Sequence, residues 1–165
     1  MKWLFNIFFG LILFTANAQQ PPAYKSINDT SFIKGDKILA PVIIFHDSRI
    51  GNTAHDSIAK IAAFLVSHPT YEVEIGFFTD FRGSDVYNKK YSTAQANTVV
   101  NYLEKKFGIP LKQIVPYGYG ETKLIYNEQD VMKESDSAVK EKMMQQNRRC
   151  EIKILDTAYT SATKK

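Results

Sequence analysis

Residues 79–103, TDFRGSDVYNKKYSTAQANTVVNYL, contain the strongest fold signal in this chain. The segment opens with a Thr-Asp pair and a glycine-containing turn, and a long polar stretch with regularly spaced apolar residues follows. Four apolar residues recur at helical spacing on one face: Ala96, Val99, Leu103 and Phe107. We therefore predict a helix over residues 84–107 that ends at Gly108.

Two short patterns inside this stretch have both a structural and a functional interpretation. Asp80 follows a predicted strand, at a place where loops present functional groups on a rigid scaffold. Its structural role would be an Asx-type bond to the backbone near Gly83. Ser92 and Gln95 have the S-x-x-Q spacing of a capping box, in which Ser92 caps a new helical segment. For Gln95, the capping role and a functional role are equally supported.

Strands and helices are predicted to alternate along the rest of the chain. The predicted strands are residues 41–47 (PVIIFHD), 71–78, 114–119 (IVPYGY) and 148–155 (RRCEIKIL). A further helix is predicted to be capped by Asn52 or Thr53 and to run to about Ser67, and another is predicted over residues 137–146. Residues 121–131 are predicted to form a loop. In the last strand Cys150, Ile152 and Ile154 should point inward, which makes Cys150 a small core residue.

The predicted fold class is α/β (α+β), with strands and helices in the order β-α-β-α-β-α-β. In the strand over residues 71–78, Val73, Ile75 and Phe77 face one way while Glu72 and Glu74 face the other. A sheet with one polar face is covered by helices on the other side only. We therefore predict a two-layer sandwich with helices packed on one face of a mixed sheet.

The predicted domain organisation is a signal peptide, an arm, one domain and a tail. Residues 1–18 combine Lys2, an apolar run and an Ala-Asn-Ala cleavage pattern, so we expect export. Residues 19–37 are predicted to be a linker or N-terminal arm, in which residues 31–37 would form an edge strand. The domain is predicted at 38–155 and a flexible tail at 156–165. No segment after residue 18 is long and apolar enough to span a membrane.

Composition excludes several classes of protein. The 165 residues are 44% hydrophobic and 23% charged, which is typical of a globular domain. A net charge of +4 is too small to predict nucleic-acid binding. The single cysteine excludes an intramolecular disulfide and a thiolate zinc cluster.

No catalytic or cofactor motif is present in the sequence. His46, His55 and His68 are scattered and form no HExxH pair, and neither a GxSxG elbow nor a phosphate-binding glycine loop occurs. We therefore expect no enzymatic activity, no cofactor and no metal. An envelope enzyme that uses the scattered histidines is the weakest alternative.

The chain resembles the OmpA-like domain, a peptidoglycan-binding module of Gram-negative cell envelopes. The residues that match its signature without gaps are Thr79, Asp80, Gly83, Tyr87, Asn88, Ser92, Ala96, Val99, Tyr102 and Leu103. Further family motifs follow in order, with GI at 108–109, GYGE at 118–121 and NRRCEI at 147–152. The resemblance extends over residues 38–155 and implies a β-α-β-α-β type fold.

The resemblance implies a noncovalent binding site for the diaminopimelate residue of the peptidoglycan stem peptide. In the family, an Asp binds the ammonium group of the ligand and an Arg binds its carboxylate. Asp80 occupies the first position, but Gln95 occupies the second. A neutral hydrogen bond contributes about 1 kcal/mol against about 1.5–3 kcal/mol for a charge-assisted one, so affinity should fall about tenfold or more.

Other residues complete the implied site. Thr79 and Asn88 belong to the same motif and are expected to line the pocket, while Arg82 and Arg148 are candidates to supply the missing positive charge.

The resemblance also implies a location in the periplasm, with an association with the outer membrane left open, and peptidoglycan and envelope proteins as partners. The alternative is an OmpA-like fold that has lost its ligand because of Gln95. Such a protein would act as an envelope scaffold or protein-interaction module.

Overall fold

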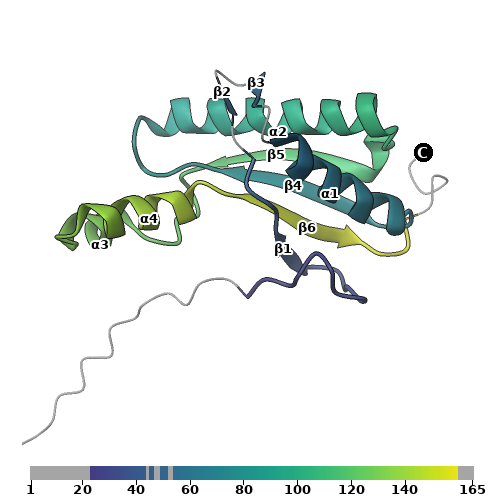
Figure 1. The fold of residues 1–165 in the computed structure, drawn as a ribbon, viewed down its shortest axis with the longest axis horizontal. Coiled ribbons are helices and arrows are strands. Elements are labelled where there is room, and N and C mark those ends of the chain that lie inside the picture. Colours follow the sequence, from purple (N-terminus) through teal and green to yellow (C-terminus); the bar gives the residue numbers. More distant parts are fainter. Residues whose placement is uncertain (1–22, 44, 47–48, 52–53, 160–165) are drawn as a thin grey trace, which may run out of the picture.

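The computed structural model describes residues 23–43, 45–46, 49–51 and 54–159 (Figure 1). The predicted signal peptide and residues 160–165 of the predicted tail lie outside these ranges. The same is true of Asn52 and Thr53, which precede the first helix.

The domain is built on a mixed sheet of four strands. Along the sheet these are β1 (Lys37–Leu39), β6 (Cys150–Asp156), β4 (Glu72–Phe78) and β5 (Ile114–Gly120). The central strand β4 is parallel to β5 and antiparallel to β6, and β1 adds to β6 as an antiparallel edge strand. The expected strands over residues 71–78, 114–119 and 148–155 are therefore confirmed.

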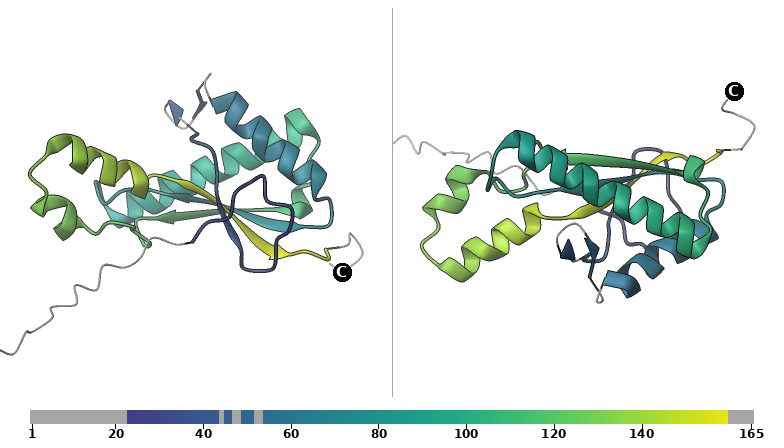
Figure 2. Two further views of the ribbon diagram at one scale, coloured as in Figure 1. Left: turned by 60° about the horizontal axis from the view of Figure 1, so that its bottom comes forward. Right: turned by 90° about the horizontal axis from the view of Figure 1, so that it is seen from above.

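Two long helices cover one face of this sheet (Figure 2). They are α1 (Ala54–Ser67) and α2 (Asp85–Phe107), and the short 3-10 helix Leu111–Gln113 leads into β5. The core between the layers contains Ile58, Ile61 and Leu65 from α1, Ala96, Val99 and Leu103 from α2, and Val73, Ile75, Ile152 and Ile154 from the sheet. The predicted two-layer sandwich is confirmed.

Helix α2 begins and ends where its sequence predicts, but the capping box at Ser92 is wrong. The Oγ of Ser84 accepts a hydrogen bond from the backbone N–H of Tyr87, and Gly108 closes the helix with a left-handed φ of 68°. Ser92 lies inside the helix, where its hydroxyl donates to the carbonyl of Asn88 and accepts from the N–H of Gly120. It therefore fastens α2 to the end of β5.

The strand predicted over residues 41–47 is also wrong as a single element. The edge of the sheet is formed by β1, which precedes residues 41–47 in the chain and in which Ile38 is fully buried. Val42 is 78% exposed, and β2 (Phe45–His46) pairs only with β3 (Arg49–Ile50) in a separate ladder. Pro41 has no N–H to donate to a ladder, which explains why pairing with β6 stops before it.

The region after β5 contains an additional short helix. The predicted loop at 121–131 ends in α3 (Glu128–Lys133), which Asn127 caps by accepting from the N–H of Asp130. The predicted helix at 137–146 is confirmed as α4 (Ser137–Asn147). Figure 1 shows α3 and α4 beyond the end of the sheet, away from the main core.

The described part of the N-terminal arm packs against the domain. Phe32 is 5% exposed and meets the ring of Phe64 edge-on, with 5.3 Å between the ring centroids. The hydroxyl of Tyr24 donates to Glu151 on the face of the sheet opposite the helices. Burial and this bond raise the pKa of Tyr24 to about 12. At the other end of the chain, the N–H of Tyr159 donates to the carbonyl of Thr70.

Candidate binding site at the end of strand β4

Asp80 follows the last residues of β4 and is held by two arginines. Its carboxylate accepts from the backbone N–H of Arg82 at 3.0 Å, which confirms the expected Asx-type turn. The guanidinium of Arg82 also bonds to both carboxylate oxygens, and Arg148 bonds to Oδ2 at 2.5 Å. The side chain of Asp80 is 5% exposed, so this carboxylate is buried with two cationic partners.

The two arginines determine the charge state of Asp80. Burial alone would raise the pKa of this carboxyl, because it penalises the ionised form. The hydrogen bonds from Arg82 and Arg148 outweigh burial and hold the pKa of Asp80 below its ordinary value. In turn, the bond to Asp80 raises the pKa of Arg82. Asp80 is therefore ionised at neutral pH and its charge is compensated within the chain.

Asn88 shapes the loop between Asp80 and α2. It is 3% exposed, and its Nδ2 donates to the carbonyls of Asp80 and Arg82 as well as to the carboxylate of Glu121. Burial and the neighbouring Asp85 carboxylate raise the pKa of Glu121. Asn88 thus fixes the position of the loop that carries both members of the Asp80–Arg82 pair.

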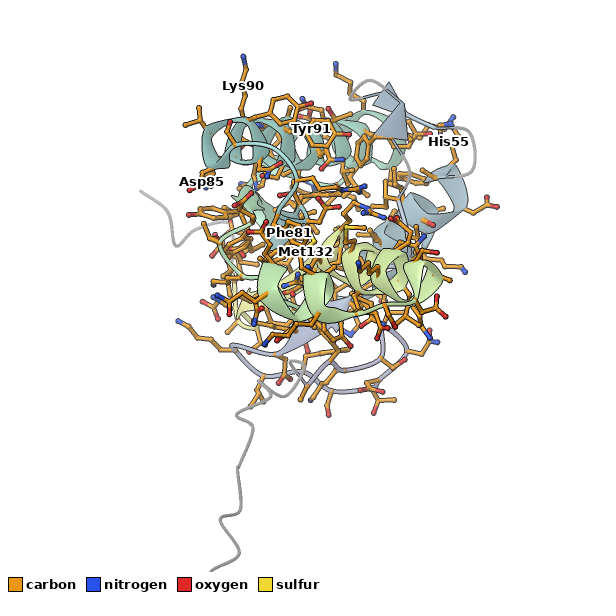
Figure 3. All side chains as sticks on the ribbon, turned by 90° about the vertical axis from the view of Figure 1, so that its left-hand side faces the viewer. His55, Phe81, Asp85, Lys90, Tyr91 and Met132 are labelled. Atoms are coloured by element: carbon orange, nitrogen blue, oxygen red, sulfur yellow. The ribbon has the colours of Figure 1, made fainter. Side chains whose placement is uncertain are left out.

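A cleft of about 820 Å³ is lined by Thr79, the residue before Asp80, and by Arg148, an ion-pair partner of Asp80. Gln95 from α2 lines it as well, while Thr79 lies directly after β4 and Arg148 lies in the connection between α4 and β6. Its apolar walls come from Leu39, Ala40, Ile43, Phe45, Phe77 and Phe78. Figure 3 views the molecule from the end at which α3 and α4 lie, with Tyr91 labelled on α2 and Phe81 labelled between α2 and the α3–α4 region. Three of the six predicted site residues, Thr79, Gln95 and Arg148, thus line one cleft, and Asp80 is linked to it by its ion pair with Arg148.

Arg148 connects this site to α4. One guanidinium nitrogen contacts Asp80 and another contacts Glu141 on α4, each at 2.5 Å. The neighbouring Arg149 points to the other face of the sheet, where it bonds to Glu151 at 2.7 Å and lies 3.8 Å from the ring centroid of Phe78. Glu141 was not predicted from the sequence, because nothing in the spacing of a polar helix indicates which of its residues faces the sheet.

His55, His68 and Cys150 each have contacts that explain them structurally, while the side chain of His46 lies outside the described part of the structure. His55 hydrogen-bonds the hydroxyl of Tyr102 at 2.7 Å, and His68 packs among the rings of Phe64 and Tyr71. Cys150 is 5% exposed, and burial raises the pKa of its thiol. Within the described ranges, no group of three His, Cys, Asp or Glu side chains is arranged to hold a metal ion.

Comparison with known proteins identifies the family. Residues 45–137, more than half of the chain, match the OmpA family. This chain belongs to the OmpA family. It is 31% identical over 90 residues to the peptidoglycan-associated lipoprotein of Buchnera aphidicola, covering 54% of this chain and 50% of that protein. It is also 29% identical over 79 residues to outer membrane porin F of Pseudomonas aeruginosa, covering 48% and 23% of the two chains.

Two solved structures share the fold of this chain. The peptidoglycan-associated lipoprotein of Burkholderia pseudomallei superposes with a TM-score of 0.53 at 24% identity, covering 68% of this chain and 87% of that one. The periplasmic domain of MotB from Helicobacter pylori gives a TM-score of 0.55 at 19% identity, covering 78% and 80%. The OmpA family chain described here spans half or less of the length of the curated relatives named above.

Two of these relatives are named for an association with peptidoglycan, and one is named as an outer membrane porin. Across the described residues of this OmpA family member, none of the helices has both the length and the apolar character that crossing a membrane requires.

Proposed function

We propose that this OmpA family domain is a non-catalytic, exported, periplasmic protein of the cell envelope that binds peptidoglycan noncovalently. Its ligand would be the diaminopimelate-containing stem peptide. The observation that carries the proposal is the buried, ionised Asp80, which follows Thr79 and pairs with Arg148, two residues that line a cleft together with Gln95. A buried carboxylate of this kind can bind an ammonium group, because the attraction between the two charges offsets the hydration that each of them loses.

Arg82 is the partner of Asp80 that a ligand can displace. Its side chain is 56% exposed, whereas that of Arg148 is 34% exposed and is anchored a second time by Glu141. A ligand ammonium would take the place of Arg82 on the Asp80 carboxylate, while Arg148 remains bound. The released Arg82, which is not among the residues that line the cleft, would then be available to a carboxylate elsewhere on the stem peptide. Asn88, which has no free amide N–H for a ligand, would act by positioning the loop.

Cosedimentation with isolated diaminopimelate-type sacculi tests the proposal. The wild-type protein should pellet with sacculi, and Asp80→Ala should lose most of this binding. Asp56→Ala is the matched control, because it removes the same charge from an exposed position in the first turn of α1. Circular dichroism would establish that each variant is folded. A folded Asp80→Ala protein that binds as well as wild type would exclude this site.

The alternative function is a scaffold or protein-interaction module that has lost the ligand. The observation in its favour is that Asp80 already has two cationic partners within the chain, while Gln95 offers no charge. In that case wild-type protein would stay in the supernatant with sacculi. Gln95→Arg would then gain binding that the natural chain lacks.

A further inference from the structure

Gln95 presents an unused amide to the cleft. It lies on α2 and lines the cleft together with Thr79 and Arg148, and its side chain makes no hydrogen bond or ion pair with any residue in the described ranges. A primary amide both donates and accepts hydrogen bonds. A ligand group that hydrogen-bonds to both polar atoms of the Gln95 amide therefore needs one donor and one acceptor of its own.

The arginines that line the cleft are already neutralised. Arg148 contacts Asp80 and Glu141. The guanidinium of Arg149 is turned to the other face of the sheet, where it pairs with Glu151, and both of these side chains are at most 6% exposed. A free carboxylate beside Gln95 would have to draw a guanidinium away from one of these acidic partners. The remaining lining cation, Lys142, is exposed on α4, where water screens its charge.

The rest of the lining is apolar or uncharged. Phe45, Phe77 and Phe78 form much of the wall, and the hydroxyl of Thr79 is buried without a hydrogen-bond partner in the described structure. Burying an ionised carboxylate against such a surface costs far more free energy than burying a neutral amide, unless a cation accompanies it. The cleft therefore favours a polar but uncharged group.

We propose that the group bound beside Gln95 is a carboxamide, so that this domain prefers stem peptides whose diaminopimelate carboxyl is amidated. This inference rests on the proposed function. The ligand NH₂ would donate to Oε1 of Gln95, and the ligand carbonyl would accept from Nε2. A carboxylate has no proton to donate, so one of its oxygens would face Oε1 without a hydrogen bond.

Fluorescence anisotropy with two synthetic stem peptides tests this preference. The peptides carry the same label and differ only in a free or an amidated carboxyl group on diaminopimelate. The wild-type protein should bind the amidated peptide at least fivefold more tightly. Gln95→Arg should reverse the order, because a guanidinium pairs with a carboxylate through two parallel bonds. Gln95→Met should abolish the preference while keeping the size of the side chain.

Asn101→Met is the matched control, since it removes an exposed amide from the same helix. It should bind both peptides as the wild type does. Equal affinity of the wild type for the two peptides, or tighter binding of the free carboxylate, would overturn the inference. A protein that still pellets with sacculi through Asp80 would in that case keep the proposed function. If the wild-type protein bound neither the peptides nor sacculi, both the inference and the proposed function would be wrong.

Discussion

Helices α2 and α4 are attached to the same sheet by different forces. Helix α2 buries six residues along its 23-residue length, and Gly118 of β5 lies so close that an added Cβ would be 2.2 Å from the backbone nitrogen of Thr93. Helix α4 has one buried residue, Asn147, and its further attachment is the ion pair between Glu141 and Arg148. Packing therefore positions α2, whereas a few polar bonds position α4.

This difference matters because the candidate site lies between the two helices. Gln95 is on the helix that packing fixes, and Arg148 follows the helix that polar bonds fix. Close-packed interfaces tolerate little displacement, while a helix held by hydrogen bonds can open locally at a lower free energy. We therefore expect the α2 side of the cleft to be rigid and the α4 side to be adjustable.

The largest effect is expected from Gly118→Ala, which tests the packing of α2. The added methyl would collide with the backbone at Thr93, so α2 or β5 must shift. We expect a loss of about 3 kcal/mol or more in the free energy of unfolding, measured by urea denaturation. Gly76→Ala is the comparison, because its nearest contact is the side chain of Tyr119 at 3.0 Å, which can move. Equal losses for the two variants would contradict the close approach of α2.

Asn147→Ala should have the next largest effect and should act mainly on α3 and α4. The side chain accepts from the N–H groups of Ile125 and Tyr126 and donates to the carbonyl of Tyr126. Losing these bonds at a fully buried position should cost about 2–3 kcal/mol. Hydrogen exchange should speed up in α3 and α4 but not in α2, and the exposed Gln146→Ala should change neither region. Uniform loss of protection would mean that α4 is not separately attached.

Asp80→Asn tests the ion pair between Asp80, after β4, and Arg148, after α4. It should lower the free energy of unfolding by about 1–2 kcal/mol at pH 7. The folded-state pKa of Asp80 is lowered, so its contribution is complete above the unfolded pKa of about 4 and is lost as the pH falls through the lower folded value. The stability difference between wild type and Asp80→Asn should therefore shrink from pH 7 to about pH 3. Denaturant titrations at both pH values measure it. A stability difference that grows on acidification would show that folding does not lower the pKa of Asp80.

The smallest effect is expected from Glu141→Gln, which weakens one contact of Arg148. Both side chains are partly exposed, at 44% and 34%, so the loss in unfolding free energy should stay below about 1 kcal/mol and decrease with added salt. Lys140→Gln, a charge change on the same helix, serves as the control. A loss as large as that of Asn147→Ala would show that the ion pair, rather than the buried amide, holds α4.

The sequence alone determined the layers of this domain and the limits of its main helix. Strict alternation in residues 71–78 predicted which side chains of β4 enter the core, because side chains on a strand point to opposite faces in turn. The apolar spacing and Gly108 likewise predicted α2, since both signals are local. The motif around Asp80 placed the candidate site at the end of β4.

Only the tertiary structure decided which partners these residues have. Ser92 fits a capping box locally, yet its hydroxyl bonds to β5, whose contact with α2 depends on the whole fold. The local sequence of residues 41–47 predicts a strand, but β1 forms the edge of the sheet instead. It does so by pairing with β6, which lies more than a hundred residues further along the chain. The pairing of Asp80 with Arg148, 68 residues further along, depends on how β4 and β6 align. Local patterns fix elements because they depend on neighbouring residues, whereas a binding cleft depends on distances between elements that no local pattern contains.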